Sequence, residues 1–160
     1  MRVRAVAAAA CLLAGCSRAP KSAPPPAPGQ PGAMAFDMSG LTLDRKRVRV
    51  SDYRGKTLVL NVFSTWCVPC REEFPDIVAL ARRKKGQPFA VLALAAQSPR
   101  SDIRKFAAQY RPPFPIVIPD KDPGDAYALS AVPVTFVISP DGRIARRFDG
   151  PAPKAEWGRL

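Results

Sequence analysis

The stretch LVLNVFSTWCVPC, residues 58–70, decides the fold of this chain. It opens with an apolar run, residues 58–63, of the kind found in strands that are buried on both faces of a sheet. Cys67 and Cys70 follow it, separated by two residues, where we expect the strand to have ended and a helix to begin. A Cys-X-X-Cys pair in this strand-then-helix context indicates thiol redox chemistry.

The position of the two cysteines at the expected helix start predicts different roles for them. Cys67 would meet unpaired backbone N–H groups and the positive end of the helix dipole, which favour its thiolate, so we predict that it is the nucleophile. Cys70 lies one turn inside the helix, on the side that we expect to be buried. It can therefore resolve a mixed disulfide by attacking the sulfur of Cys67.

Two other interpretations of this cysteine pair fit the sequence less well. A zinc half-site would need two further soft ligands, but the chain has no histidine, and its other cysteines, Cys11 and Cys16, belong to the N-terminal segment. A structural disulfide is the second alternative, although a bridge across so short a loop constrains the unfolded chain very little. We therefore predict a redox pair that needs neither a metal nor a cofactor.

The N-terminal residues are typical of an export signal. Two arginines precede an apolar run, residues 6–13, that is too short to span a bilayer, and LAGC follows at residues 13–16. This pattern resembles a bacterial lipoprotein signal, which implies that residues 1–15 are removed and that Cys16 carries lipid. An ordinary secretory signal cleaved near the same place is the alternative. Either way we expect the domain to lie outside the cytoplasm, which is the periplasmic side of the membrane if the cell is Gram-negative.

We expect two regions after the signal. Residues 16–33 would form the lipidated cysteine and a proline-rich tether, because residues 17–33 contain six prolines and no large apolar side chain. Such a tether would reach roughly 50 Å at about 3.1 Å per residue. Residues 34–160 are long enough for one domain with a core of its own.

The charge of the chain is strongly positive, with 25 lysines and arginines against 13 acids. The basic residues are scattered over expected helix ends and hairpin edges, at 45–49, 82–85 and 143–147, which is the pattern of a solvated surface. We therefore predict no nucleic-acid partner. Attraction to anionic lipid or to an acidic partner is the better interpretation of the charge.

Alternating elements follow the cysteines. Phe74, Ile77, Val78 and Ala81 form one apolar helical face, in a helix that Pro75 should kink and Gly86 should end. We expect strands at 48–50, 58–63, 89–95, 116–118, 134–138 and 143–148, with further helices from Ser101 to Pro112 and at 125–130. This order predicts an α/β fold with a mixed sheet and helices on both faces.

The same order, with WCVPC at 66–70 and Val-Pro before a late strand, resembles the thioredoxin fold, and more closely its exported TlpA/ResA-type branch. Three features carry the closer resemblance: SDYRGK at 51–56, the Cys-x-x-Glu-x-Pro pattern at 70–75, and the helix and strand at 101–118, which match the insertion of this branch. The resemblance covers roughly residues 36–150. It implies a thiol–disulfide oxidoreductase that reduces exported proteins, apocytochrome c among them, and that a membrane electron donor re-reduces.

Glu73 is the candidate proton acceptor for the resolving step. Asn61 stands where thioredoxin itself has a buried aspartate, and an amide cannot titrate. Glu73 shares a helix face with Cys70 at i, i+3, and the resemblance places the active-site glutamate of the branch here. A surface acid that merely stabilises the helix start is the alternative. Glu72 should face solvent.

The resemblance also implies a cis peptide bond before Pro133, which would turn the backbone of Val132 toward the cysteines to pair with a substrate strand. The sequence alone would equally allow a trans proline at a sheet edge. Trp66 is expected to pack beside the motif and shield the disulfide, or else to be a half-buried aromatic. Val134, where the branch often has a small polar residue, predicts a more apolar substrate groove. The short segment from Lys154 onward predicts thin cover over one face of the sheet.

Other functions stay open. A thiol oxidant of the same fold is the main alternative. A peroxidase is disfavoured because Ser64 and Leu60 stand where such enzymes have threonine and proline. A copper chaperone of this fold would use Cys-x-x-x-Cys and a distant histidine, which this chain lacks. A binding module without turnover would need only the substrate-pairing backbone at Val132 and Pro133, and would not require the two cysteines.

Overall fold

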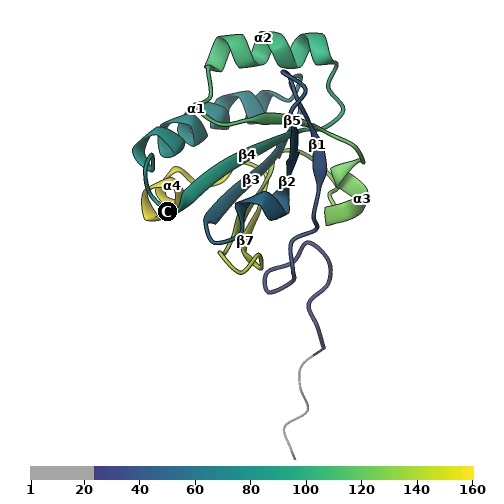
Figure 1. Cartoon of the computed structure of the whole chain (residues 1–160), viewed down its shortest axis with the longest axis vertical. Helices are drawn as coiled ribbons and strands as arrows, with labels where there is room; N and C mark the ends of the chain where they lie inside the picture. Colours follow the sequence, from purple (N-terminus) through teal and green to yellow (C-terminus); the bar gives the residue numbers. More distant parts are fainter. Residues whose placement is uncertain (1–23) are drawn as a thin grey trace, which may run out of the picture.

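A seven-stranded mixed sheet organises the computed structural model, which describes residues 24–160 (Figure 1). The strand order is β2-β1-β5-β4-β3-β6-β7. The strands are β1 Ser39–Thr42, β2 Arg47–Arg49, β3 Thr57–Phe63, β4 Phe89–Ala95, β5 Ile116–Pro119, β6 Val134–Ile138 and β7 Ile144–Asp149. The helices are the 3-10 helix η1 Val50–Tyr53, α1 Val68–Arg83, α2 Arg100–Tyr110, α3 Pro123–Tyr127 and α4 Lys154–Arg159. The expected signal and Cys16 lie outside the described residues.

The central strand, β3, is the apolar run of the sequence. It pairs in parallel with β4 and antiparallel with β6, and six of its seven residues are buried. Apolar side chains on both faces of this strand lose contact with water, which drives the sheet to form at its centre. The expectation of a strand buried on both faces is confirmed.

Side chains of β3 point alternately to the two layers of the fold. Val59 and Phe63 face α1, α2 and α4, and they join two hydrophobic clusters with these helices. Leu60 and Val62 face the opposite layer, where Tyr127 of α3 and the segment before β1 complete a third cluster. Figure 1 shows α3 on the other side of the sheet from α1 and α4. The predicted mixed sheet with helices on both faces is therefore confirmed, and the three clusters lie entirely within residues 24–160.

An aromatic cluster holds α1 and α2 against the sheet. The ring of Phe74 lies 5.3 Å from that of Phe63 and 4.7 Å from that of Phe106, between ring centroids. Tyr110 completes the cluster at 4.4 Å from Phe106. Aromatic pairs at such distances add to the stabilisation that burial of the rings provides. The inserted helix α2 is thus fixed beside the first turns of α1, where the cysteines lie.

Three local expectations need correction. Ser101 does not cap α2, because the helix begins at Arg100 and Pro99 occupies the N-cap position. The short helix predicted at 125–130 lies at Pro123–Tyr127 instead, since the side chain of Asp122 accepts a hydrogen bond from the backbone N–H of Gly124 and starts the helix earlier. The sequence analysis also missed β1, a four-residue strand between β2 and β5.

The last residues of the expected tether pack on the domain. The carbonyl oxygen of Gly29 accepts a hydrogen bond from the guanidinium of Arg147, and the N–H of Gly32 donates to the carbonyl of Ile144 in β7. A Cβ at position 29 would lie 2.5 Å from the carbonyl oxygen of Tyr127, and the φ there is +76°, so only glycine fits. The packed segment therefore begins about five residues before the boundary expected at residue 34.

Helix α4 packs on the face of the sheet that carries Val59, although the sequence analysis expected thin cover over one face. Trp157 is buried there and belongs to the cluster that contains Val59 and Ile77. The guanidinium of Arg83 at the end of α1 donates to the carbonyl oxygen of Trp157. A six-residue helix is sufficient because one large aromatic side chain fills the space against α1.

Candidate active site

The two cysteines form a disulfide at the start of α1, with their Cα atoms 5.3 Å apart. Cys67 is the N-cap residue of this helix, so the strand ends and the helix begins where the sequence analysis expected. The backbone N–H of Cys70 points at the sulfur of Cys67, with 3.2 Å between nitrogen and sulfur. In the reduced protein this donor and the helix dipole would favour negative charge on Cys67 rather than on Cys70.

Both sulfur-bearing residues are largely covered, with 5% of Cys67 and 2% of Cys70 exposed. The sulfur of Cys67 lies 3.5 Å from the carbonyl oxygen of Val132. The next peptide bond, Val132–Pro133, is cis. The loop before β6 therefore brings a backbone carbonyl beside the expected nucleophile, across 65 residues of sequence.

Glu73 follows Cys70 by three residues on α1 and is buried, with 5% of it exposed. One carboxyl oxygen, Oε1, accepts a hydrogen bond of 2.7 Å from the backbone N–H of Ala152, in the loop between β7 and α4. The other, Oε2, accepts a hydrogen bond of 3.5 Å from the side-chain amide of Asn61. Burial raises the pKa of Glu73 to about 7, and the negative charge of Asp76 adds to the rise, while these two hydrogen bonds oppose it. Glu73 is thus a carboxyl group that can take up or release a proton near neutral pH.

Asn61 connects this carboxyl group to β6. Its amide nitrogen donates a hydrogen bond of 2.9 Å to the hydroxyl of Thr135, which is fully buried. Thr135 faces Asn61 in the antiparallel pairing of β3 and β6. The sequence analysis missed Thr135, although it is the one hydroxyl residue in an otherwise apolar strand, VTFVI. Glu72, by contrast, is exposed as predicted.

Trp66 is more exposed than expected, and its position needs correction. The residue is 62% exposed, and its indole Nε1 donates a hydrogen bond of 3.0 Å to the carbonyl oxygen of Gln97 after β4. The alternative of a half-buried aromatic is therefore wrong, and the hydrogen bond holds the ring near the end of β4. Shielding of the disulfide by Trp66 stays a prediction. Val68, on the other side of Cys67, is also exposed. The nucleophile is thus flanked by two apolar side chains in contact with water.

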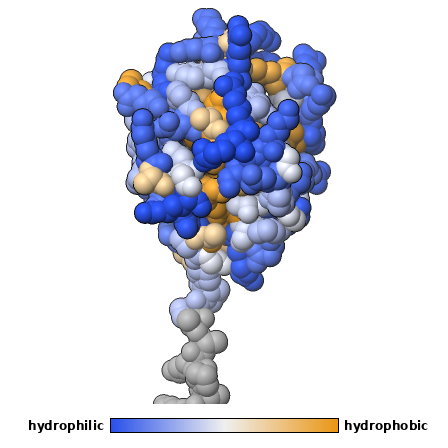
Figure 2. Space-filling model, turned by 90° about the vertical axis from the view of Figure 1, so that its left-hand side faces the viewer, coloured by the Kyte–Doolittle hydropathy of each residue, from blue (hydrophilic) through white to orange (hydrophobic). Residues whose placement is uncertain are grey.

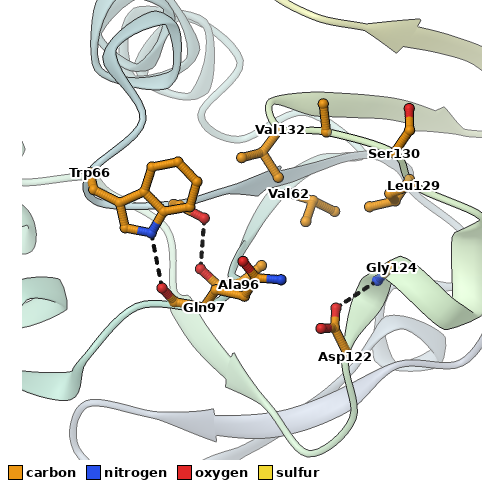
Figure 3. Close-up of a pocket in the computed structure, with 11 residues that line it drawn as sticks. Val62, Trp66, Ala96, Gln97, Asp122, Gly124, Leu129, Ser130 and Val132 are labelled. Carbon is orange, nitrogen blue, oxygen red and sulfur yellow. Dashed lines mark hydrogen bonds between the residues drawn. The ribbon is translucent and has the colours of Figure 1, made fainter.

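A small pocket of about 170 Å³ opens between Trp66 and the loop before β6 (Figure 3). Val62, Leu129 and Val132 provide apolar walls. Two of the polar groups drawn in Figure 3 have partners inside the protein: Asp122 accepts a hydrogen bond from the backbone N–H of Gly124, and the indole of Trp66 donates to the carbonyl oxygen of Gln97. Val62, Leu129 and Val132 thus supply the apolar surface beside the cysteines. Val134 does not line this pocket, and its side chain is buried in the core.

Residues 24–160 contain neither a candidate metal cluster nor a candidate membrane span. No group of three or more histidine, cysteine, aspartate or glutamate side chains within residues 24–160 could hold a metal ion. None of the helices in this part of the chain has both the length and the apolar composition that crossing a bilayer requires.

The fold and the site define a thiol–disulfide oxidoreductase of the thioredoxin fold. A disulfide at the N-terminus of the helix after the central strand, facing a cis-proline loop, is the arrangement of this class. Residues 31–147 match the AhpC/TSA family, and the chain belongs to this family.

Relatives and solved structures agree with this class. The chain is 35% identical over 129 residues to the thiol-disulfide oxidoreductase ResA of Geobacillus kaustophilus, an alignment that covers 80% of this chain and 74% of the relative. It is 34% identical over 106 residues to ResA of Bacillus subtilis, over 66% of this chain but only 59% of the relative. A putative thiol:disulfide interchange protein DsbE of Chlorobium tepidum superposes with a TM-score of 0.73 at 26% identity, covering 81% of this chain and 92% of that structure. The resemblance to the ResA-type branch is thereby confirmed.

Proposed function

We propose that this chain is a lipid-anchored reductase that transfers two electrons from its cysteine pair to disulfides of exported proteins, outside the cytoplasm. One observation carries the proposal: the helix that begins at the cysteine pair also carries, three residues after Cys70, a buried carboxyl group whose pKa is about 7. The first feature favours a reactive thiolate, and the second supplies a proton acceptor near neutral pH.

The proposed reaction begins with the reduced pair. The thiolate of Cys67 attacks one sulfur of a substrate disulfide, and the substrate's second sulfur leaves as a thiolate that takes a proton from water. A mixed disulfide between Cys67 and the substrate results. Cys70 then loses its proton and attacks the sulfur of Cys67, which releases the second substrate thiolate and closes the Cys67–Cys70 disulfide. The substrate disulfide is thereby reduced to two thiols, and the enzyme pair is oxidised.

Glu73 is the acceptor that we propose for the proton of Cys70. It is three residues further along α1, on the buried side of the helix, and the neighbouring amide of Asn61 cannot take a proton. The hydrogen bonds from Ala152 and Asn61 favour its ionised form and partly offset the cost of burial, which keeps the pKa of Glu73 near 7.

The substrate would bind along the loop before β6. In the proposed complex, an extended segment of the substrate pairs with the backbone at Val132, beside the cis proline Pro133. Trp66 and Val68 would contact apolar side chains that flank the substrate cysteine. Dithiols of apocytochrome c are the substrate that the resemblance to the ResA-type branch suggests, and a membrane protein that donates electrons would re-reduce Cys67 and Cys70.

The reduction potential of the Cys67–Cys70 pair tests the direction of electron flow. We expect a potential near that of thioredoxin, about −270 mV, because a reductant of exported proteins must lose electrons readily. The measurement is equilibration of the protein with glutathione or dithiothreitol buffers, followed by trapping and counting of free thiols. A value near −120 mV, typical of a strong oxidant, would replace the proposed reductase with a thiol oxidase.

The proposed anchor makes a separate prediction about Cys16. Mature protein extracted from the native membrane should begin at this residue and carry acyl mass, because LAGC at residues 13–16 resembles a lipoprotein processing site. The variant Cys16→Ala should lose both the acyl mass and the normal processing of the N-terminus. Intact-mass spectrometry of the two proteins provides the comparison, with Cys11→Ala as the control that should be processed normally. An unmodified N-terminus on membrane-extracted protein would refute the anchor.

A further inference from the structure

A second hollow in the surface, away from the cysteines, combines positive charge with apolar side chains. It has a volume of about 570 Å³ and lies between the end of α1, the start of β4 and the segment before β5. Its rim carries Arg82, Lys84 and Lys85, its apolar wall includes Phe89 and Phe114, and none of its lining residues is acidic. We call this hollow the basic groove. Figure 2 shows the face of the molecule on which α1 and α4 lie in Figure 1, with apolar atoms in the middle bordered by strongly hydrophilic residues.

The cations of the basic groove are not neutralised by the protein's own acids. Among the ion pairs within residues 24–160, none involves residues 82–85. The guanidinium of Arg82 donates instead to the carbonyl oxygen of Arg111, and the ammonium of Lys84 lies 5.9 Å from the ring centre of Phe89. Cations at a helix C-terminus do stabilise a helix, because they interact favourably with the negative end of its dipole. That role does not require Lys85, which lies beyond the end of α1, or the apolar wall.

The basic groove is separate from the redox site. Helix α1 carries Cys67 at its N-cap and the groove at its C-terminal end. The 16 residues of this helix span about 24 Å at about 1.5 Å per residue. A ligand in the groove would therefore leave the cysteines and the loop at Val132 open to a substrate.

We propose that the basic groove binds the anionic phospholipid surface of the membrane. Such a surface presents phosphate groups above acyl carbons, and the groove presents cations above phenylalanine and proline side chains, so the two match in charge and in polarity. A bilayer is favoured over an acidic protein because the proposed lipid anchor keeps the domain within a tether's length of it. In this respect the inference rests on the proposed function. Binding through this end of α1 turns the opposite end, with the redox pair, away from the lipid.

The test uses the unlipidated chain, residues 17–160, which contains all three hydrophobic clusters. Sedimentation with vesicles should show binding to phosphatidylcholine containing about one third phosphatidylglycerol, and no binding to phosphatidylcholine alone. Replacement of all three rim cations in one variant, Arg82→Gln with Lys84→Gln and Lys85→Gln, should weaken binding by roughly 10-fold or more. The matched control removes three exposed cations elsewhere, Arg104→Gln with Lys105→Gln and Lys121→Gln, and should weaken binding less than about 2-fold.

Two outcomes would overturn the inference. Equal losses in the two triple variants would show that only the overall charge of the chain matters. Binding of polyglutamate in place of anionic vesicles, lost in the groove variant alone, would assign the groove to an acidic protein. Disulfide reduction is measured on the same samples and should be unchanged in both variants, and thermal unfolding verifies that both variants are folded. A failure of the proposed reductase activity would appear only in that assay, whereas a failure of lipid binding would appear only in sedimentation.

Discussion

A mixed disulfide with substrate should accumulate in the Cys70→Ser variant and should be absent from Cys67→Ser. Cys67 is the N-cap of α1 and receives the N–H of Cys70 at its sulfur, so its thiolate is the more stable of the two. Without Cys70 the first attack still occurs, but nothing resolves its product. Turnover should be lost in both variants. Non-reducing electrophoresis and intact-mass analysis after mixing with a disulfide-containing protein distinguish them.

The same asymmetry should appear in alkylation of the reduced protein near neutral pH, where Cys67 should react first. The double variant, Cys67→Ser with Cys70→Ser, is the control for any reaction at other residues. If the substrate is trapped through Cys70 in Cys67→Ser, then the assignment of the two roles must be reversed. Thermal unfolding of the reduced proteins should be similar, because serine replaces cysteine with a small change in volume.

The second large effect is expected for Glu73→Gln. Loss of the titrating group should slow the resolving attack by Cys70 roughly 100-fold at pH 7, the lower end of the range for general base catalysis. The first attack by Cys67 should change little, since Glu73 lies on the buried side of α1. Stopped-flow thiol exchange measures the two steps separately across pH. The parental resolving step should show an ionisation near pH 7 that the variant lacks.

Glu72→Gln is the matched control, because it removes an exposed carboxyl group from the neighbouring position of the same helix. Its resolving rate should equal that of the parent at every pH. If Glu73→Gln also resolves mixed disulfides at the parental rate throughout, then Glu73 is only a structural acid near a helix start.

The raised pKa of Glu73 also predicts how stability depends on pH. The folded-state pKa, about 7, is above the ordinary value of 4.5, so the folded protein holds the proton more tightly than the unfolded chain does. Below pH 4.5 the group is protonated in both states and costs nothing. As the pH rises from 4.5 to 7, the parent should lose stability relative to Glu73→Gln, by up to about 3 kcal/mol at about 1.36 kcal/mol per pKa unit. Urea unfolding of the oxidised proteins at several pH values measures how the free energy of unfolding of each protein changes with pH.

Much of the fold followed from local patterns. The predicted strand at 134–138 has the same bounds as β6, and those at 58–63 and 89–95 agree with β3 and β4 to within one residue. These strands lie at the centre of the sheet, where burial on both faces demands apolar side chains and makes the signal strong. The missed strand, β1, contains Ser39 and Thr42 and pairs with an exposed edge strand. Its sequence therefore shows little alternation between apolar and polar side chains.

Helix ends were harder to predict, because capping depends on which of several polar residues meets the free N–H groups. Ser101 has a suitable side chain, but α2 begins one residue before it, after Pro99. Asp122 and Pro123 form a cap and a first helical residue, a signal that was present in the sequence and was overlooked.

The sequence by itself determined the redox pair and its orientation, because Cys67 and Cys70 are three residues apart and a strand-to-helix turn is a local structure. Only the tertiary structure decided the proton affinity of Glu73. Its partners, Asn61 and Ala152, lie 12 and 79 residues away, and one of them acts through a backbone N–H that any residue except proline could supply. The pKa of a carboxyl group depends on the water that surrounding elements exclude, and here the packing of β3, β6 and the loop before α4 excludes it.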